Sequence, residues 1–126
     1  MGELSAYAFE LVDYIADTAR SDSISFSQAL KNASAAQIKK TADGLVLTGV
    51  SANSASSTFS FVSSFKPTQV IELINLLRKM QSLAVTVLAS EGNLTPTDDQ
   101  VVAWIKLNLD DCFVNSTIID YSEVML

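Results

Sequence analysis

Residues 67–93 read PTQVIELINLLRKMQSLAVTVLASEGN and carry the strongest hydrophobic pattern in the chain. Their apolar residues recur at alternating spacings of three and four, which places them on one face of an α-helix. The stripe consists of Val70, Leu73, Leu77, Met80, Ala84 and Val87, widened by Ile74, Leu76, Leu83 and Leu88. Pro67 suits the first turn of a helix and Gly92 its end. A helix this apolar is typical of a central core element, and its width also leaves room for a partner helix.

Two helical signals precede this segment. Residues 3–20 have an apolar stripe with acidic residues mostly on the other side, which predicts an amphipathic helix. The stretch Ser25-Phe-Ser-Gln28 has the spacing of a capping box, so a second, short helix is expected to start near Phe26 and to bury Phe26, Ala29 and Leu30. The stretch Ser34-Ala-Ala-Gln37 repeats that signature and predicts a third short helix that ends at Asp43-Gly44.

After Gly44, the spacing of apolar residues changes from the period of a helix to that of a β-strand. Apolar and small polar residues alternate over residues 45–50 and again over residues 58–65, with the polar stretch 51–57 between them. Two runs of this kind separated by a polar loop predict a β-hairpin, with Phe59, Phe61 and Phe65 on its buried face.

Another helix is expected after the central one, with Thr95 as its cap and Pro96 in its first position. Its predicted buried face consists of Val101, Trp104, Ile105 and Leu109. The tail, residues 117–126, is too apolar for a solvated end, so we expect it to pack on the domain or on a neighbouring copy.

These elements predict a single domain over residues 1–126 with an α+β, mainly α fold. It would contain about five helices and a single β-hairpin in the middle, at about residues 45–65. The order of helix, two short helices, strand, polar loop and strand is also the order of a winged helix-turn-helix.

The amino-acid composition argues against several kinds of catalytic and metal-binding site. The chain of 126 residues has no histidine, and its one cysteine, Cys112, leaves no partner for an internal disulfide or a multi-cysteine zinc site. Because histidine is absent, the chain lacks the usual general base that activates a serine or cysteine nucleophile. The four glycines are too far apart for a phosphate-binding loop. We expect a protein that is not an enzyme, with no catalytic residues, no metal site and no cofactor.

Charge is distributed unevenly. The formal net charge is −6, from 14 acidic and 8 basic residues. Residues 1–22 and 91–126 hold twelve of the acidic residues, whereas residues 23–90 hold six of the basic ones. This separation favours complementary contact with copies of the same chain or with another protein.

A DNA-binding alternative rests on the winged-helix order. Residues 35–42 would be its recognition helix and residues 51–57 its wing. The residues offered to nucleic acid would be Lys31, Gln37, Lys39 and Lys40. The expected recognition helix has no arginine and the wing has no basic residue, so nucleic acid is not the partner we expect.

The leading hypothesis is a non-enzymatic protein–protein interaction and assembly module that forms a homo-oligomer. The candidate contact residues are Ile118, Ile119, Tyr121, Val124, Met125 and Leu126 of the tail, with Phe59 and Phe61 of the hairpin. By analogy, such a chain suits a repeated subunit of a phage or viral particle. A small acidic chaperone or adaptor is the further alternative, and a monomer at every salt concentration would favour it.

The expected cellular location rests on two sequence signals, a secretory signal and a membrane-spanning segment, neither of which we find in this sequence. The first twenty residues open with Glu3 and contain three more acidic residues, unlike a secretory signal. The nearest candidate for a bilayer span, residues 80–90, is well short of the roughly 18 residues required. We therefore expect a cytoplasmic protein or a part of a virion, without a membrane partner.

Overall fold

The computed structural model describes residues 3–34, 37–41, 44–48, 60–61, 67–114 and 117–118, and side chains within 5–34 and 68–113. Four α-helices make up most of this part of the chain: α1 (Glu3–Asp22), α2 (Phe26–Ser34), α3 (Pro67–Ser90) and α4 (Asp98–Asn108). A 3-10 turn (Leu109–Cys112) follows α4. The strands are short: β1 (Gln37–Thr41), β2 (Gly44–Thr48), β3 (Ser60–Phe61), β4 (Phe113–Val114) and β5 (Thr117–Ile118).

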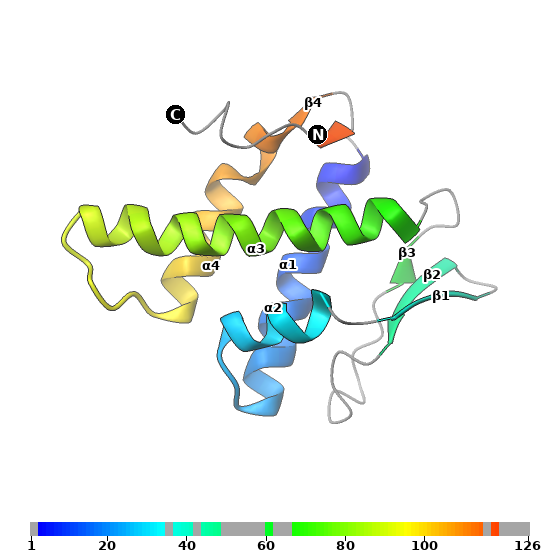
Figure 1. Cartoon of the computed structure of the whole chain (residues 1–126), viewed down its shortest axis with the longest axis horizontal. Helices are drawn as coiled ribbons and strands as arrows, with labels where there is room; N and C mark the ends of the chain where they lie inside the picture. Colours follow the sequence, from blue (N-terminus) through cyan, green and yellow to red (C-terminus); the bar gives the residue numbers. More distant parts are fainter. Residues whose placement is uncertain are drawn as a thin grey trace.

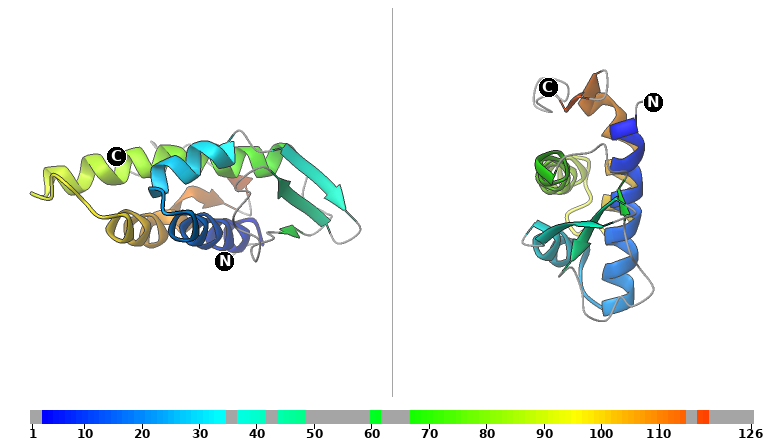
Figure 2. Two further views of the ribbon diagram at one scale, coloured as in Figure 1. Left: turned by 90° about the horizontal axis from the view of Figure 1, so that it is seen from below. Right: turned by 90° about the vertical axis from the view of Figure 1, so that its right-hand side faces the viewer.

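The helices lie in two layers. Helices α2 and α3 form one layer, and α1 and α4 form the other, with α3 crossing both helices behind it (Figures 1 and 2). Strand β2 pairs with β1 on one side and with β3 on the other, and both pairs are antiparallel. Strands β4 and β5 form a separate antiparallel pair.

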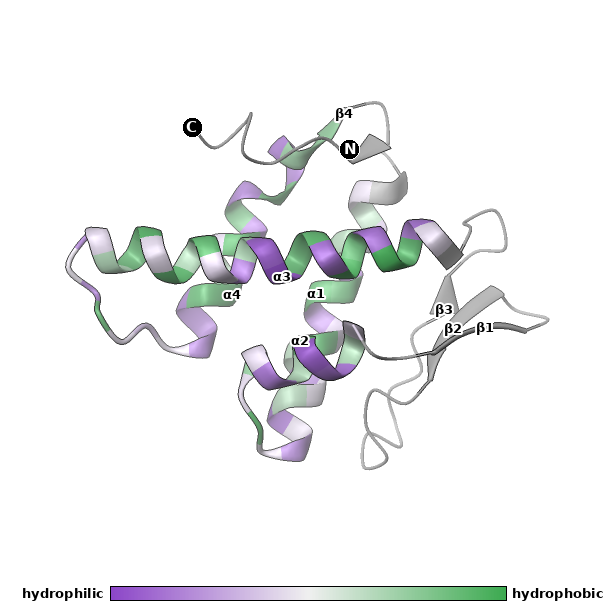
Figure 3. Cartoon of the chain, in the orientation of Figure 1, coloured by the Kyte–Doolittle hydropathy of each residue, from purple (hydrophilic) through white to green (hydrophobic). Residues whose placement is uncertain are grey.

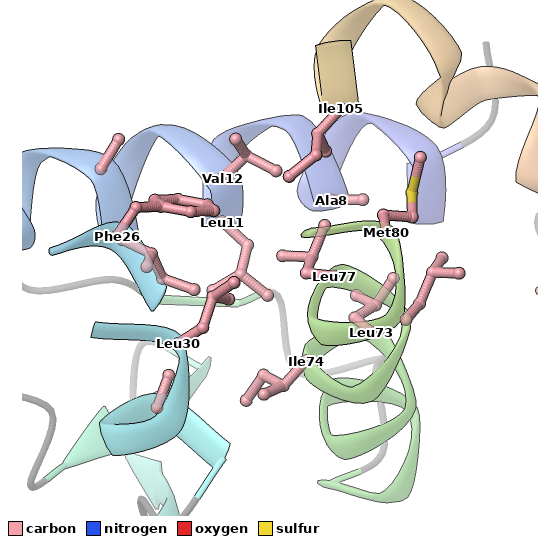
Figure 4. Close-up of a cluster of buried hydrophobic side chains, with 14 of the residues drawn as sticks. Ala8, Leu11, Val12, Phe26, Leu30, Leu73, Ile74, Leu77, Met80 and Ile105 are labelled. Atoms are coloured by element: carbon pink, nitrogen blue, oxygen red, sulfur yellow. The ribbon is translucent and has the colours of Figure 1, made fainter. Parts of the chain in front are cut away.

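The buried core lies where the two layers meet. Ala8 and Leu11 of α1 approach Leu73 and Leu77 of α3, and Leu30 of α2 lies on the same cluster (Figure 4). Every residue in the described core comes from the four helices or the 3-10 turn. Burial of this apolar surface is therefore the main source of stability for the described fold.

The α+β fold class expected from the sequence is wrong. The described part of the chain is helical, with four α-helices where about five were expected, and no described core residue belongs to a strand. The strands pair across β1, β2 and β3, so a single hairpin at residues 45–65 does not describe them. The fold is set by helix-on-helix packing, because the wide apolar faces of the helices bury one another.

The prediction of a third short helix is also wrong, because residues 37–41 form strand β1. Thr41 pairs with Gly44, which leaves two residues between β1 and β2. Aspartate followed by glycine favours a tight hairpin turn as well as a helix end, and here the strand pairing decides. The winged-helix interpretation fails with this helix, since no recognition helix exists at the expected place.

Helix α2 begins where the sequence predicts and is capped twice. The Gln28 backbone N–H donates to the Ser25 hydroxyl at 3.0 Å. The Phe26 backbone N–H donates to Oδ2 of Asp98 at 3.0 Å, so the first residue of α4 holds the start of α2 in place. Because free N–H groups at a helix start attract an acceptor, Asp98 fixes the two layers relative to each other at this end.

The cap of α4 is Thr97 rather than Thr95. The Gln100 backbone N–H donates to the Thr97 hydroxyl at 3.2 Å, and the Thr97 backbone N–H donates to the Gln100 side chain at 2.9 Å. This reciprocal pair satisfies two otherwise free donors, so the helix starts two residues later than expected.

Burial along α3 is uneven. Leu73, Leu77 and Met80 are fully buried, as predicted. After Ala84, no residue of α3 is fully buried, and this end extends past α4 towards the following loop (Figure 1). Trp104 of α4 is only partly buried, against expectation, because the residues that face the core here are Val101 and Ile105 of α4 and Leu109 of the 3-10 turn.

Candidate functional site

A groove of about 710 Å³ runs between α2 and α3. Its lining includes three cationic side chains: Lys31 from α2, and Arg78 and Lys79 from α3. Most of its other lining residues are neutral and polar, and Leu83 is its one leucine. No acidic residue is among the lining residues that the structure describes.

The core-facing pattern of both helices places these residues at the surface. Helix α2 buries Phe26, Ala29, Leu30 and Ala33, which leaves Ser27 and Lys31, one turn apart, outside the core. Along α3, Asn75, Arg78 and Ser82 follow one another at spacings of three and four and so share one side of the helix. Hydrophilic residues are visible on the outward side of α2 and near the middle of α3 (Figure 3).

The other layer has the opposite charge. Helices α1 and α4, with the 3-10 turn, carry nine acidic and two basic residues, whereas α2 and α3 carry three basic and one acidic. Both basic residues of the acidic layer are in ion pairs: Lys106 with Asp13 at 2.9 Å, and Arg20 with Asp17 and Asp99. The two layers therefore present surfaces of opposite sign.

Cys112 is fully buried, and its thiol contacts Met80 Sδ at 3.9 Å. Burial, together with the nearby Asp111 carboxylate, raises the pKa of the Cys112 thiol to about 11. Because the thiolate is the reactive form, this cysteine is inert near neutral pH. The described residues also bring together no group of three or more acidic or cysteine side chains that could hold a metal ion.

The described structure includes only some of the candidate residues taken from the sequence. Lys31 lies in the groove, whereas Gln37, Lys39 and Lys40 lie in β1. Phe61 belongs to β3 and Ile118 to β5, where it pairs with Phe113. Residues outside the described part of the chain are Phe59, Ile119, Tyr121, Val124, Met125 and Leu126. The predicted packing of the tail on the domain or on a neighbouring copy therefore concerns residues that lie mostly outside it.

Sequence reasoning missed Arg78 and Lys79 as site residues. They are adjacent cations in a helix whose only other charged residue is Glu72. That contrast was visible in the sequence, but its meaning depends on α2 lying alongside and adding Lys31. A pattern along one helix cannot supply this information.

Comparison with protein-family models, curated proteins and solved structures finds no match for this chain. Among the described residues, no helix combines the length and the apolar character that crossing a bilayer requires.

Proposed function

We propose that this protein is a non-enzymatic interaction module that assembles with copies of itself through surfaces of opposite charge. The observation that carries the proposal is the separation of charge between the two helical layers. A cationic groove lies between α2 and α3, and the acidic residues gather on α1, α4 and the turn after α4. Complementary potentials of this kind steer association and fix the orientation of partners.

Two further features support a binding role. The volume of the groove lies within the range of about 300–1,000 Å³ found for binding pockets, but most of its lining residues are charged or polar, whereas small-molecule sites are mainly apolar. Ile71, Leu94 and Leu107 are exposed on the described surface, which offers apolar contact in addition to charge. A charged protein segment is therefore a better match to the groove than an apolar metabolite. A repeated subunit of a larger particle, such as a virion, is one setting for this activity.

The test is the solution mass at two salt concentrations, about 20 mM and about 500 mM, because salt screens contacts between exposed charges. We expect oligomers at low salt that dissociate at high salt. A chain that stays at the monomer mass of 13.5 kDa in both would contradict the proposal and favour an adaptor.

A pair of matched variants ties the effect to the groove. Lys31→Gln with Arg78→Gln removes one cation from each wall of the groove, and we expect it to abolish the low-salt oligomer. Ala6→Glu with Ala103→Glu changes the net charge by the same amount at exposed positions of α1 and α4. This control should retain the oligomer, since it leaves the groove intact and only adds to the acidic layer.

A further inference from the structure

We infer that the acidic element received by the groove is loop 91–99 of a second copy of this chain, which comprises the connection between α3 and α4 and the first two residues of α4. The inference rests on the proposed self-assembly and names the contact that produces it. Loop 91–99 contains Glu91, Asp98 and Asp99 and no basic residue, and it presents Leu94 with 78% of its surface exposed. Few described apolar side chains are so fully in solvent.

The loop is held in a defined shape, so Leu94 is presented on a fixed support. The Asn93 side chain donates to Gln100 at 2.9 Å, and Gln100 also closes the cap of α4. The Asn93 backbone N–H donates to the Leu88 carbonyl at 2.9 Å, which fixes the exit from α3. A preformed loop loses little conformational freedom when it binds, which favours association.

The groove offers the complement of this loop. Lys31 and Arg78 provide one cation on each wall of the groove for the exposed carboxylates of Glu91 and Asp99, and Leu83 supplies an apolar contact for Leu94. The groove is lined only by residues of α2 and α3 in the described part of the chain, so the loop of the same copy does not fill it. The contact is therefore made between copies.

Leu107 is the second strongly exposed leucine, at 82%, but its surroundings make it a poorer match. The adjacent Lys106 is cationic and is paired with Asp13. The nearby Asp110 accepts a hydrogen bond from the Ser5 hydroxyl, so part of its charge is already engaged. In loop 91–99, Asp98 and Asp99 are likewise engaged, with the Phe26 N–H and with Arg20. Glu91, however, forms no ion pair among the described residues, and no basic residue lies beside Leu94 in the sequence.

The contact joins two different surfaces, a groove on one copy and a loop on the next. Such a heterologous contact leaves one groove and one loop free in any dimer, so it continues into rings or filaments. A symmetric dimer would instead place the same surface against itself. This difference provides the test.

The experiment mixes two variants that each lack one half of the contact. The groove variant is Lys31→Gln with Arg78→Gln, and the loop variant is Glu91→Gln, Leu94→Ser and Asp99→Asn. Asp98 is left unchanged because it caps α2. A control with equal changes in charge and apolarity elsewhere is Glu10→Gln, Leu107→Ser and Asp111→Asn, all at exposed positions. Solution mass is measured at low salt up to about 1 mM protein, because exposed ion pairs give weak contacts.

We expect the wild type and the control to assemble, and each variant alone to remain a monomer. An equimolar mixture of the two variants should form a complex of twice the monomer mass of 13.5 kDa and nothing larger, since only one intact loop meets one intact groove. Circular dichroism of each variant verifies that the helices are retained.

Other outcomes overturn the inference in distinguishable ways. A loop variant that assembles as the wild type does would remove loop 91–99 from the contact while leaving self-assembly in place. A mixture that gives only monomers would show that an intact loop and an intact groove do not bind each other, which overturns the inference. A wild type that is monomeric at low salt would contradict the proposed function itself.

Discussion

Helix α3 has an inner and an outer segment that are similarly rich in apolar residues but differ in what packs against them. The inner segment, Val70–Ala84, has its apolar stripe fully buried against the other three helices. The outer segment, Val85–Ser90, is equally rich in apolar residues, yet none of them is fully buried. Hydrophobic periodicity thus identified the helix, but not how far its partners extend along it.

The difference teaches that burial is decided by the neighbouring helices. The inner segment lies where α1, α2 and α4 converge, whereas the outer segment extends beyond α4 (Figure 1). The groove opens beside the middle of α3 and reaches Leu83 and Thr86, where the full burial of the stripe ends. The inner segment therefore has a buried stripe on one face and most of the α3 side chains that line the groove on another.

Substitution of one leucine in each segment tests this contrast most strongly. Leu77→Ala should lower the free energy of unfolding by about 2–5 kcal/mol, because it opens a cavity among closely packed side chains. Leu88→Ala should cost less than about 1.5 kcal/mol, since part of the Leu88 surface is already in water. Denaturant titration of both variants measures the difference. Equal losses would mean that the two segments are equally packed.

Alkaline pH probes the inner segment through Cys112, which contacts Met80. The native thiol holds its proton up to a pKa of about 11, whereas an unfolded thiol releases it near its ordinary pKa of 9.0. Between these values the native state binds more protons, so stability is fully present below pH 9 and falls as pH rises towards 11. Burial likewise raises the pKa of Tyr14, which adds to the loss at the upper end.

Cys112→Ala separates the two contributions. The variant should lose stability at every pH because it leaves a small cavity, but its stability should decline less steeply between pH 9 and 11. Tyr14 is unchanged in this variant, so the decline in stability that remains measures the contribution of Tyr14. Thermal unfolding at a series of pH values gives both slopes, and identical slopes would show that the thiol is not shielded from water.

Features that depend on interactions between residues close in sequence could be predicted, whereas features that depend on contacts between distant residues could not. The helices that start near Glu3, Phe26 and Pro67 were correctly placed, because caps and apolar spacing are local signals. Strand β1 was missed, because Asp43-Gly44 fits both a helix end and a hairpin turn, and pairing with residues 44–48 decided between them. Trp104 was assigned to the core because periodicity gives a helix face but not the width covered by its neighbours.

The groove was the least predictable feature. Its cations lie in two helices separated by more than thirty residues, and only the packing of α2 against α3 brings them together. The sequence did show that the acidic and basic residues occupy different parts of the chain. It could not show that the acidic parts, α1 and α4, share one layer.

The end of the outer segment depends on Gly92, whose φ of +102° is a conformation that residues with a side chain rarely adopt. An added Cβ would meet no atom within 4 Å, so any cost of Gly92→Ala comes from the backbone alone. We expect a loss of about 1–2 kcal/mol in the free energy of unfolding. A neutral result would mean that the loop after α3 has other conformations of equal energy.

The end of α1 has the same hydrogen-bond pattern as the end of α3 but closes on a serine. Ile24 N–H donates to the Ala19 carbonyl at 3.0 Å, the counterpart of the bond from Asn93 to Leu88, and Ser23 has a φ of +57°. Because a side chain disfavours this conformation, Ser23→Gly should raise the free energy of unfolding by about 0.5–1 kcal/mol, opposite in sign to Gly92→Ala. Ser21→Gly, inside the last turn of α1, should instead lower it by about 1 kcal/mol, since glycine weakens a helix interior. If both glycine variants were destabilised, the left-handed position of Ser23 would carry no cost. The C-terminal ends of α1 and α3 would then differ in whether a left-handed residue costs free energy there, and not only in the residue that occupies the position.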